Sequence, residues 1–325
     1  MDRLTAAGYR PDQPRDPGGE SGGQWVATQV WESPGKEIEE TIRPEVLQAF
    51  SRHSSNSVYR MSYGGKDWNV KKESNYPHNM RENIVGGRDT QRELAAQEVW
   101  QIMAALDPAG VGALGYPEFH RWLVATDPEF TVGTHWGSKP VAVGAAEWID
   151  APKVSSLGST PTGMHDPPNW PGTDVPQLGW MHPSIPDRQL RALVLFDHVI
   201  GNQDRHGANA RFDGVRLYPI DHGLTFPSAP DAHTTYWSGP GMWIKRRGTT
   251  GSKLTELERN VLVEMDKNWD DVVRRVSPHL TKKEIQSMRT RVQYMIREDE
   301  FLTHNTIESN LANPARNQLR RQASR

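Results

Sequence analysis

Four stretches of the chain repeat apolar side chains at the three- and four-residue spacing of an α-helix. These predicted helices cover residues 88–106, 187–200, 254–276 and 281–301. The second is apolar on nearly every side, which predicts a helix buried inside a larger lobe. The last begins with Thr281 followed three residues later by Glu284, the sequence signature of a capping box.

Shorter runs alternate apolar and polar residues and predict strands. We expect strands at residues 58–63 and 68–72, joined by a turn at Gly64-Gly65, and further strands at residues 119–124 and 141–149. A second hairpin is expected from Ala210 to Ile220, because Asp213-Gly214 is a strong tight-turn signal between two alternating runs. Residues 75–88 are polar and predict a loop.

The order of these elements predicts an α+β chain, with a small sheet and one helix first and mainly helices after it, and a length of 325 residues permits two lobes or two domains. Residues 151–186 are rich in Pro and Gly, which is typical of a loop insertion between them. Both ends of the chain are polar and lack the apolar residues that a packed core needs. We therefore expect five segments: a disordered tail (1–26), the small lobe (27–150), the insertion (151–186), the helical lobe (187–302) and a second disordered tail (303–325).

The composition excludes several classes of protein. A net charge of -2 gives no support for binding to nucleic acid or to anionic membranes. The absence of cysteine excludes disulfides and thiolate metal sites. No apolar run approaches the length of a membrane span, and the N-terminus has no signal-peptide core. With 35% hydrophobic residues and twelve Trp, the 325-residue chain can still build a sizeable core in part of its length.

Acidic and amide side chains gather in two turns, one before and one after the second hairpin. Asp204 and Asn209 lie in the first turn, and Asp221 opens the second. Because a hairpin brings its two ends together, these three side chains are expected to converge on one spot. Carboxylate and amide oxygens suit Mg²⁺, which usually binds through one or two protein groups plus substrate phosphates.

These turns resemble the signature of a known family. The string DRHGAN followed by IDHG is similar to the DRHxxN…DFG signature of phosphatidylinositol 3- and 4-kinases and their atypical kinase relatives, and closer to a bacterial and phage group of kinase-like proteins. The resemblance implies a two-lobed protein-kinase-like fold, ATP and Mg²⁺. Asp204 would then be catalytic, with Asn209 and Asp221 as metal ligands. His222 replaces the usual Phe, Gln203 precedes the catalytic Asp, and no glycine-rich loop is present.

A kinase-like site also needs a strand lysine and a helix carboxylate. The family pattern of aromatic, apolar, then Lys favours Lys71, whereas strict alternation from Val70 favours Lys72. Glu93, near the start of the first helix, is the expected ion-pair partner of that lysine. Thr90 and Glu93 also match a capping box, in which Glu93 would only bind backbone N–H groups.

Two further segments are candidate nucleotide contacts. Ser54, Ser55 and Asn56 precede the first hairpin and could turn N–H and hydroxyl groups toward phosphate, although a surface turn has the same composition. Backbone groups from Glu147 to Ile149 occupy the place of a kinase hinge, so the resemblance implies that they contact adenine.

Two other functions stay open. His198, His206 and His222 lie near Asp204 and Asp221 in sequence and allow a transition-metal hydrolase, although His198, like Asp197 beside it, is expected to be an internal hydrogen-bonding residue. The other alternative is a catalytically inactive, kinase-like phage structural or assembly protein.

The N-terminal segment PRDPGGESGGQW is similar to linkers in phage head-assembly and portal-associated proteins of actinobacterial viruses.

Taken together, the two turns and the kinase resemblance favour a phosphotransferase that moves a phosphoryl group to a hydroxyl of an unknown protein, lipid or small-molecule acceptor. We expect it to be cytoplasmic in a bacterial host or associated with a virion, with a phage particle or a host protein as a further partner.

Overall fold

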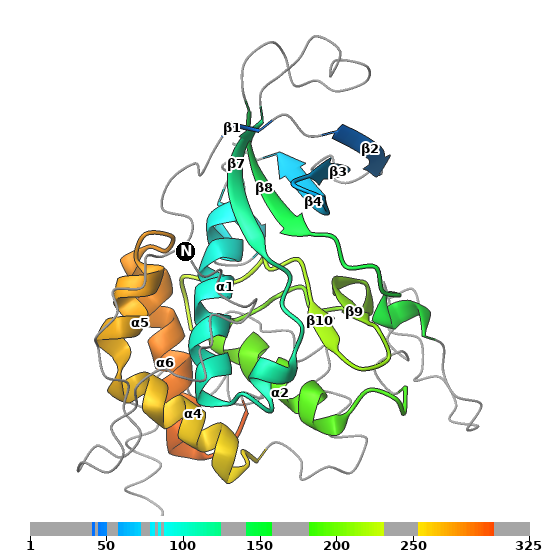
Figure 1. Cartoon of the computed structure of the whole chain (residues 1–325). Helices are drawn as coiled ribbons and strands as arrows, with labels where there is room; N and C mark the ends of the chain where they lie inside the picture. The colour runs from blue at the N-terminus through cyan, green and yellow to red at the C-terminus, as the bar shows by residue number, and fades with distance from the viewer. Residues whose placement is uncertain are drawn as a thin grey trace, which may run out of the picture.

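The structure is a computed structural model that describes residues 41–42, 45–50, 58–72, 79–81, 84–85, 88–124, 141–157, 182–230 and 253–301. It has a mixed α+β fold, with a mainly antiparallel sheet formed before residue 150 and most helices after it (Figure 1). The strands are β1 (Thr41–Ile42), β2 (Glu45–Phe50), β3 (Val58–Tyr63), β4 (Lys66–Lys72), β5 (Asn79–Arg81), β6 (Ile84–Val85), β7 (Phe119–Val124), β8 (Val141–Glu147), β9 (Ala210–Phe212) and β10 (Leu217–Pro219). The helices are α1 (Asp89–Leu106), α2 (Asp187–Ile200), α4 (Glu256–Lys267), α5 (Trp269–Val276) and α6 (Lys282–Glu298), with 3-10 turns η1 (Val111–Ala113), η3 (Val154–Ser156) and η5 (Gly207–Asn209).

The main sheet has the strand order β1-β7-β8-β4-β3-β2, with β1 parallel to β7 and the other neighbours antiparallel. The expected hairpin forms β3 and β4, and Gly64 and Gly65 have φ values of 62° and 77° at its turn. Such left-handed backbone is cheap for glycine alone, so these two residues fix the place of the turn. Buried side chains of one sheet face make a small core of their own: Tyr59, Met61, Trp68, Val70, Trp122, Val143 and Ala145.

Helix α1 belongs to a different core. Its buried apolar side chains pack in one cluster with those of α2, α4, α5 and α6. Figure 1 shows α1 below the sheet with α4, α5 and α6 alongside it. The helix therefore lies between the sheet and the helical part and is packed as part of the latter.

Buried ion pairs reinforce this arrangement. Arg92 of α1 lies 3.5 Å from Glu284 of α6, and Glu98 of α1 lies 2.6 Å from Arg275 of α5. Both acidic partners are at most 5% exposed at the side chain. Burial lowers the pKa of Arg92 and raises that of Glu98, and their partners oppose both shifts. Removing one member of such a pair leaves a buried charge, so α1 is held firmly against the helical core.

Most predicted elements form where the sequence placed them. The hairpins, the strand at Phe119–Val124 and the helix at Asp187–Ile200 are confirmed, and Thr281 with Glu284 forms the predicted capping box. The single helix predicted over residues 254–276 is wrong, because α4 ends at Lys267 and α5 begins at Trp269. Asn268 between them donates its side-chain N–H to the Glu264 carbonyl at 2.9 Å.

Other differences are smaller. The loop predicted at residues 75–88 contains the short strands β5 and β6, and strands β1 and β2 had no counterpart in the prediction. The predicted tails and most of the 151–186 insertion lie outside the described residues. No helix in the described ranges is both long and apolar enough to cross a bilayer.

Candidate functional site

The first turn of the site follows directly from the end of α2. Gly201 ends the helix in the left-handed conformation, with φ 63°. Asn202 then donates its side-chain N–H to Asp197 at 3.0 Å and accepts from the Asp204 N–H at 2.9 Å. The buried helix therefore sets the position of Asp204, whose side chain is 25% exposed.

Arg205 fixes this turn to the second one. Its guanidinium is fully buried and lies 3.0 Å from the Asp197 carboxylate, which is 2% exposed. It also donates to the carbonyl of Asn209 and, at 2.8 Å, to the carbonyl of Ile220. One side chain thus joins the end of α2 to both ends of the β9–β10 hairpin.

Asn209 and Asp204 touch each other within the first turn. The Asn209 amide nitrogen donates to the Asp204 carbonyl at 2.9 Å and to its carboxylate at 3.2 Å. The amide nitrogen is thereby used, and the amide oxygen is the group that Asn209 can offer to a cation. His206 Nε2 lies 3.8 Å from the same Asp204 carboxylate.

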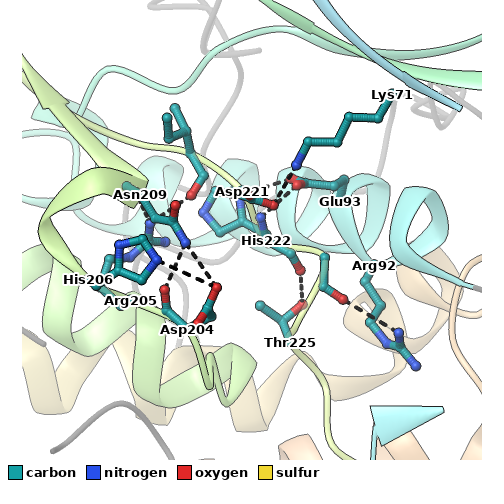
Figure 2. A network of polar contacts seen from close by, with 12 residues as sticks. Lys71, Arg92, Glu93, Asp204, Arg205, His206, Asn209, Asp221, His222 and Thr225 are labelled. Carbon is teal, nitrogen blue, oxygen red and sulfur yellow. Dashed lines mark hydrogen bonds and ion pairs between the residues drawn. The ribbon is translucent and has the colours of Figure 1, made fainter. Parts of the chain in front are cut away.

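The hairpin brings Asp221 to the same place. The Ile220 N–H donates to the Asn209 carbonyl at 3.1 Å, so Asp221 follows directly after a residue paired with Asn209. Asp221 has a φ of 61°, which is unusual for a residue other than glycine. Figure 2 shows the Asp204 and Asn209 group beside the group formed by Asp221, Lys71 and Glu93.

Lys71 forms an ion pair with Asp221. Its Nζ lies 2.7 Å from Asp221 Oδ1, and the two side chains are 36% and 44% exposed. Burial acts to lower the pKa of Lys71, but Asp221, Glu93 and then Asp89 outweigh it and raise that pKa. Burial likewise acts to raise the pKa of the Asp221 carboxyl, and the Lys71 ammonium outweighs it and holds that pKa low.

The register of β4 explains why Lys71 faces Asp221. Val70 belongs to the sheet's own aromatic core, so its neighbour Lys71 points to the opposite face. Strict alternation favours Lys72 only if Val70 faces the site, which it does not. The side chain of Lys72 lies outside the described part of the chain.

Glu93 contacts His222, and not Lys71 as the sequence predicts. One carboxylate oxygen accepts from the His222 backbone N–H at 2.6 Å, and the other lies 3.1 Å from His222 Nδ1. A direct ion pair between Glu93 and Lys71 is therefore not the arrangement found. The capping box is not formed either, because α1 begins after Arg88 and Thr90 lies inside the helix.

The proposed hinge uses two of its N–H groups internally. The Glu147 N–H donates to the Glu118 carbonyl at 2.8 Å, and the Trp148 N–H donates to the Asp67 carbonyl at 2.8 Å. An adenine contact through Glu147 to Ile149 stays a prediction, with those two donors already used. Ser54, Ser55 and Asn56 lie outside the described residues.

Two functional positions were missed by sequence reasoning. Arg205 stands inside the DRH string, yet nothing local indicates that it is fully buried and contacts both turns. His222 departs from the family pattern in sequence, yet its ring stacks on Tyr116 at 5.3 Å and faces Phe196 edge-on at 5.6 Å. The ring thus fills an aromatic position in the core while keeping a polar edge for Glu93.

The donor set fits Mg²⁺ better than a transition metal. Asn209 and Asp221 offer oxygen atoms, and Asp221 is exposed enough to be reached. His198 is buried, with Nδ1 2.7 Å from the Val194 carbonyl as expected of an internal hydrogen-bonding residue, and His222 is occupied by Glu93. Within the described segments, no three His, Asp or Glu side chains are grouped to hold a metal ion.

Comparisons with known proteins give little beyond this geometry. No protein-family model matches the sequence, and no curated protein matches it at a significant level. Among solved structures, the chain is similar to a Helicobacter pylori proinflammatory kinase, CtkA, at 13% identity and a TM-score of 0.40, over 82% of this chain and 98% of that one. A likeness this distant assigns neither an activity nor a substrate to the chain.

Proposed function

We propose that the protein is an ATP- and Mg²⁺-dependent phosphotransferase that moves a phosphoryl group to a hydroxyl of a protein, lipid or small-molecule acceptor. The observation that carries the proposal is the convergence of Asp204, Asn209 and Asp221 at the base of one hairpin, with Lys71 at 2.7 Å from Asp221. The resemblance of DRHGAN and IDHG to the kinase signature supports the same reading.

Each residue has a role that its surroundings suit. When bound, Mg²⁺ and ATP supply the γ-phosphoryl group and the positive charge that neutralises it during transfer. Asn209 and Asp221 would hold the cation, and Lys71 would bind phosphate oxygens. Asp204 would orient the acceptor hydroxyl and take its proton as the new P–O bond forms, while the bond from the γ-phosphorus to the β–γ bridging oxygen breaks and ADP leaves.

The site is built to hold these groups still. Asp204 is fixed through Asn202 to the end of α2, and Arg205 joins both turns in the buried interior. Fixed charges and positioning are the main contributions a protein makes to phosphoryl transfer. A phage or prophage origin, and a virion or host-protein partner, remain part of the proposal on the likeness of the N-terminal segment alone.

The test is transfer of label from γ-labelled ATP in the presence of Mg²⁺, with the purified protein alone and with bacterial lysate. The variants are Asp204→Asn and Asp221→Asn, and Asn tolerates the left-handed backbone at residue 221. Asp270→Asn, on the exposed surface of α5, is the matched control. Wild type and the control should transfer label, and each site variant should be slower by on the order of 10²–10⁴-fold.

Other outcomes separate the alternatives. Equal transfer by wild type and both site variants contradicts the assignment of these residues. Mg²⁺-dependent ATP binding without transfer favours the catalytically inactive kinase-like protein. Absence of both binding and transfer rejects the phosphotransferase proposal.

A further inference from the structure

The Glu93 carboxylate of α1 contacts two polar groups of the residue that follows Asp221. It accepts from the His222 backbone N–H at 2.6 Å and lies 3.1 Å from His222 Nδ1. We propose that Glu93 is a positioning residue for Asp221, acting through His222, and that its charge on Lys71 is secondary. This inference rests on the proposed function, in which Asp221 is a metal ligand.

The backbone at Asp221 needs such support. Its φ of 61° is disfavoured for a residue with a side chain, and such conformations persist where surrounding contacts determine them. The N–H that Glu93 binds belongs to the peptide group joining Asp221 to His222. Holding that peptide sets the backbone rotation after Asp221, and with it the direction of the Asp221 carboxylate toward Lys71.

Other contacts fix the rest of the turn. Thr225 donates its hydroxyl to the His222 carbonyl at 2.7 Å, and Arg92 lies 3.5 Å from the Gly223 carbonyl. Arg92 and Glu93 are consecutive residues of α1, so one short piece of helix binds two consecutive residues of the turn, His222 and Gly223. Because Arg92 also pairs with Glu284, that piece of helix is itself anchored to α6.

The imidazole of His222 helps to hold the turn through a proton on Nδ1 that faces Glu93. The ring is 1% exposed, and its Nδ1 lies 3.3 Å from the Tyr116 hydroxyl as well as near Glu93. Nothing in the described part of the protein hydrogen-bonds to His222 Nε2. A proton on Nδ1 gives the Glu93 carboxylate a donor, whereas a proton on Nε2 would leave a lone pair facing that carboxylate. The geometry therefore favours a proton on Nδ1.

A comparison of Glu93→Gln with Glu93→Ala separates positioning from charge. Gln keeps an oxygen that accepts the His222 backbone N–H but has no charge to offer Lys71. Its amide N–H faces His222 Nδ1, so in this variant the ring carries its proton on Nε2, which has no partner in the described part of the protein. Ala has none of these groups. Positioning predicts that Glu93→Gln stays within about threefold of wild type while Glu93→Ala weakens Mg²⁺ affinity and turnover by about 10–100-fold. Gln91→Ala, two residues earlier on the same helix, is the matched control and should match wild type.

Two measurements on the metal-free protein and one on the complex decide the matter. Amide hydrogen exchange should show the His222 N–H protected in wild type and Glu93→Gln but not in Glu93→Ala, and imidazole ¹⁵N spectra of wild type should show the proton on Nδ1. Mg²⁺ is titrated at a fixed concentration of a fluorescent ATP analogue. Glu93→Ala should need a higher Mg²⁺ concentration for half-saturation than wild type, whereas its affinity for the nucleotide at saturating Mg²⁺ should change less than its affinity for Mg²⁺. Thermal melting checks that each variant folds.

The inference and the proposed function fail in different ways. If wild type transfers label and Glu93→Gln is as impaired as Glu93→Ala, then Glu93 acts through its charge on Lys71 and the positioning inference is wrong. If the His222 N–H of wild type exchanges freely, the inference is wrong whatever the activity. If wild type shows neither Mg²⁺-dependent nucleotide binding nor transfer, the proposed function fails, and the amide exchange still decides whether Glu93 holds the turn.

Discussion

Replacing Arg205 by Met should cost about 3–5 kcal/mol of unfolding free energy. The Asp197 carboxylate is 2% exposed, and without the guanidinium the Asn202 side-chain N–H is its one remaining side-chain donor among the described residues. Ile220 also loses the donor to its carbonyl, whereas Asn209 keeps the Ile220 N–H at 3.1 Å. Met fills most of the vacated volume, so the cost is dominated by the buried unpaired carboxylate and not by a cavity.

The assay is urea unfolding followed by tryptophan fluorescence, with midpoint and slope compared between variants. Arg259→Met is the matched control, because Arg259 and Asp299 are 47% and 48% exposed with atoms 3.8 Å apart, a pair expected to contribute about 0–1 kcal/mol. The double variant Arg205→Met with Asp197→Leu removes both charges and should recover at least about 2 kcal/mol relative to Arg205→Met alone. A loss no larger than that of the control, or a double variant no more stable than the single one, would refute the reasoning.

Three further outcomes follow from particular contacts. Gly201→Ala should destabilise the fold by about 1–3 kcal/mol, measured by the same urea unfolding, because a Cβ there would lie 2.8 Å from Arg291 Cζ in left-handed backbone; an unchanged midpoint would contradict this. Asp221→Asn should lower the pKa of Lys71, because Asp221 is the strongest of the charges that raise that pKa. Side-chain carbon NMR titration of Lys71 should show the lower pKa. In wild type, the ion pair stabilises the fold below the unfolded lysine pKa of about 10.4, and this contribution is lost as pH rises through the higher folded pKa. Glu118 has a pKa lowered to about 2, and the largest cause is a hydrogen bond from His120. The contribution of Glu118 to stability is therefore present above about pH 4.3 and lost as pH falls toward 2. Carboxyl NMR that found Glu118 titrating near pH 4.3 would contradict this prediction.

The local patterns of the sequence predicted the frame of the site. The spacing of Asp204 and Asn209, and the Asp213-Gly214 turn, were enough to expect that both ends of the hairpin meet, because a hairpin is a local structure. The bounds of α2 followed from its apolar residues between Pro186 and Gly201. These features depend on residues close in sequence, which is the range over which patterns are informative.

The choice of partners within the site could not be predicted in the same way. Glu93 and His222 are 129 residues apart, and Lys71 and Asp221 are 150 apart. Which carboxylate meets the lysine depends on how α1 packs against the sheet and the second turn, and no local spacing records that packing. The sequence predicts that Glu93 pairs with the strand lysine, whereas in the folded protein Glu93 contacts His222 and Lys71 pairs with Asp221.

The two sets of contacts at Asp221 differ in how firmly they hold. Glu93 and Arg205 bind the turn in surroundings where the Arg205 guanidinium and the His222 ring are almost fully buried. The Lys71 ion pair is exposed at 36% and 44%, and an exposed pair contributes about 0–1 kcal/mol. When the surroundings of Asp221 change, Lys71 is therefore the contact that yields while the turn keeps its shape. In the proposed phosphotransferase, a divalent cation at Asp221 would replace the ammonium as its counter-ion, and the released ammonium would bind an anion such as phosphate.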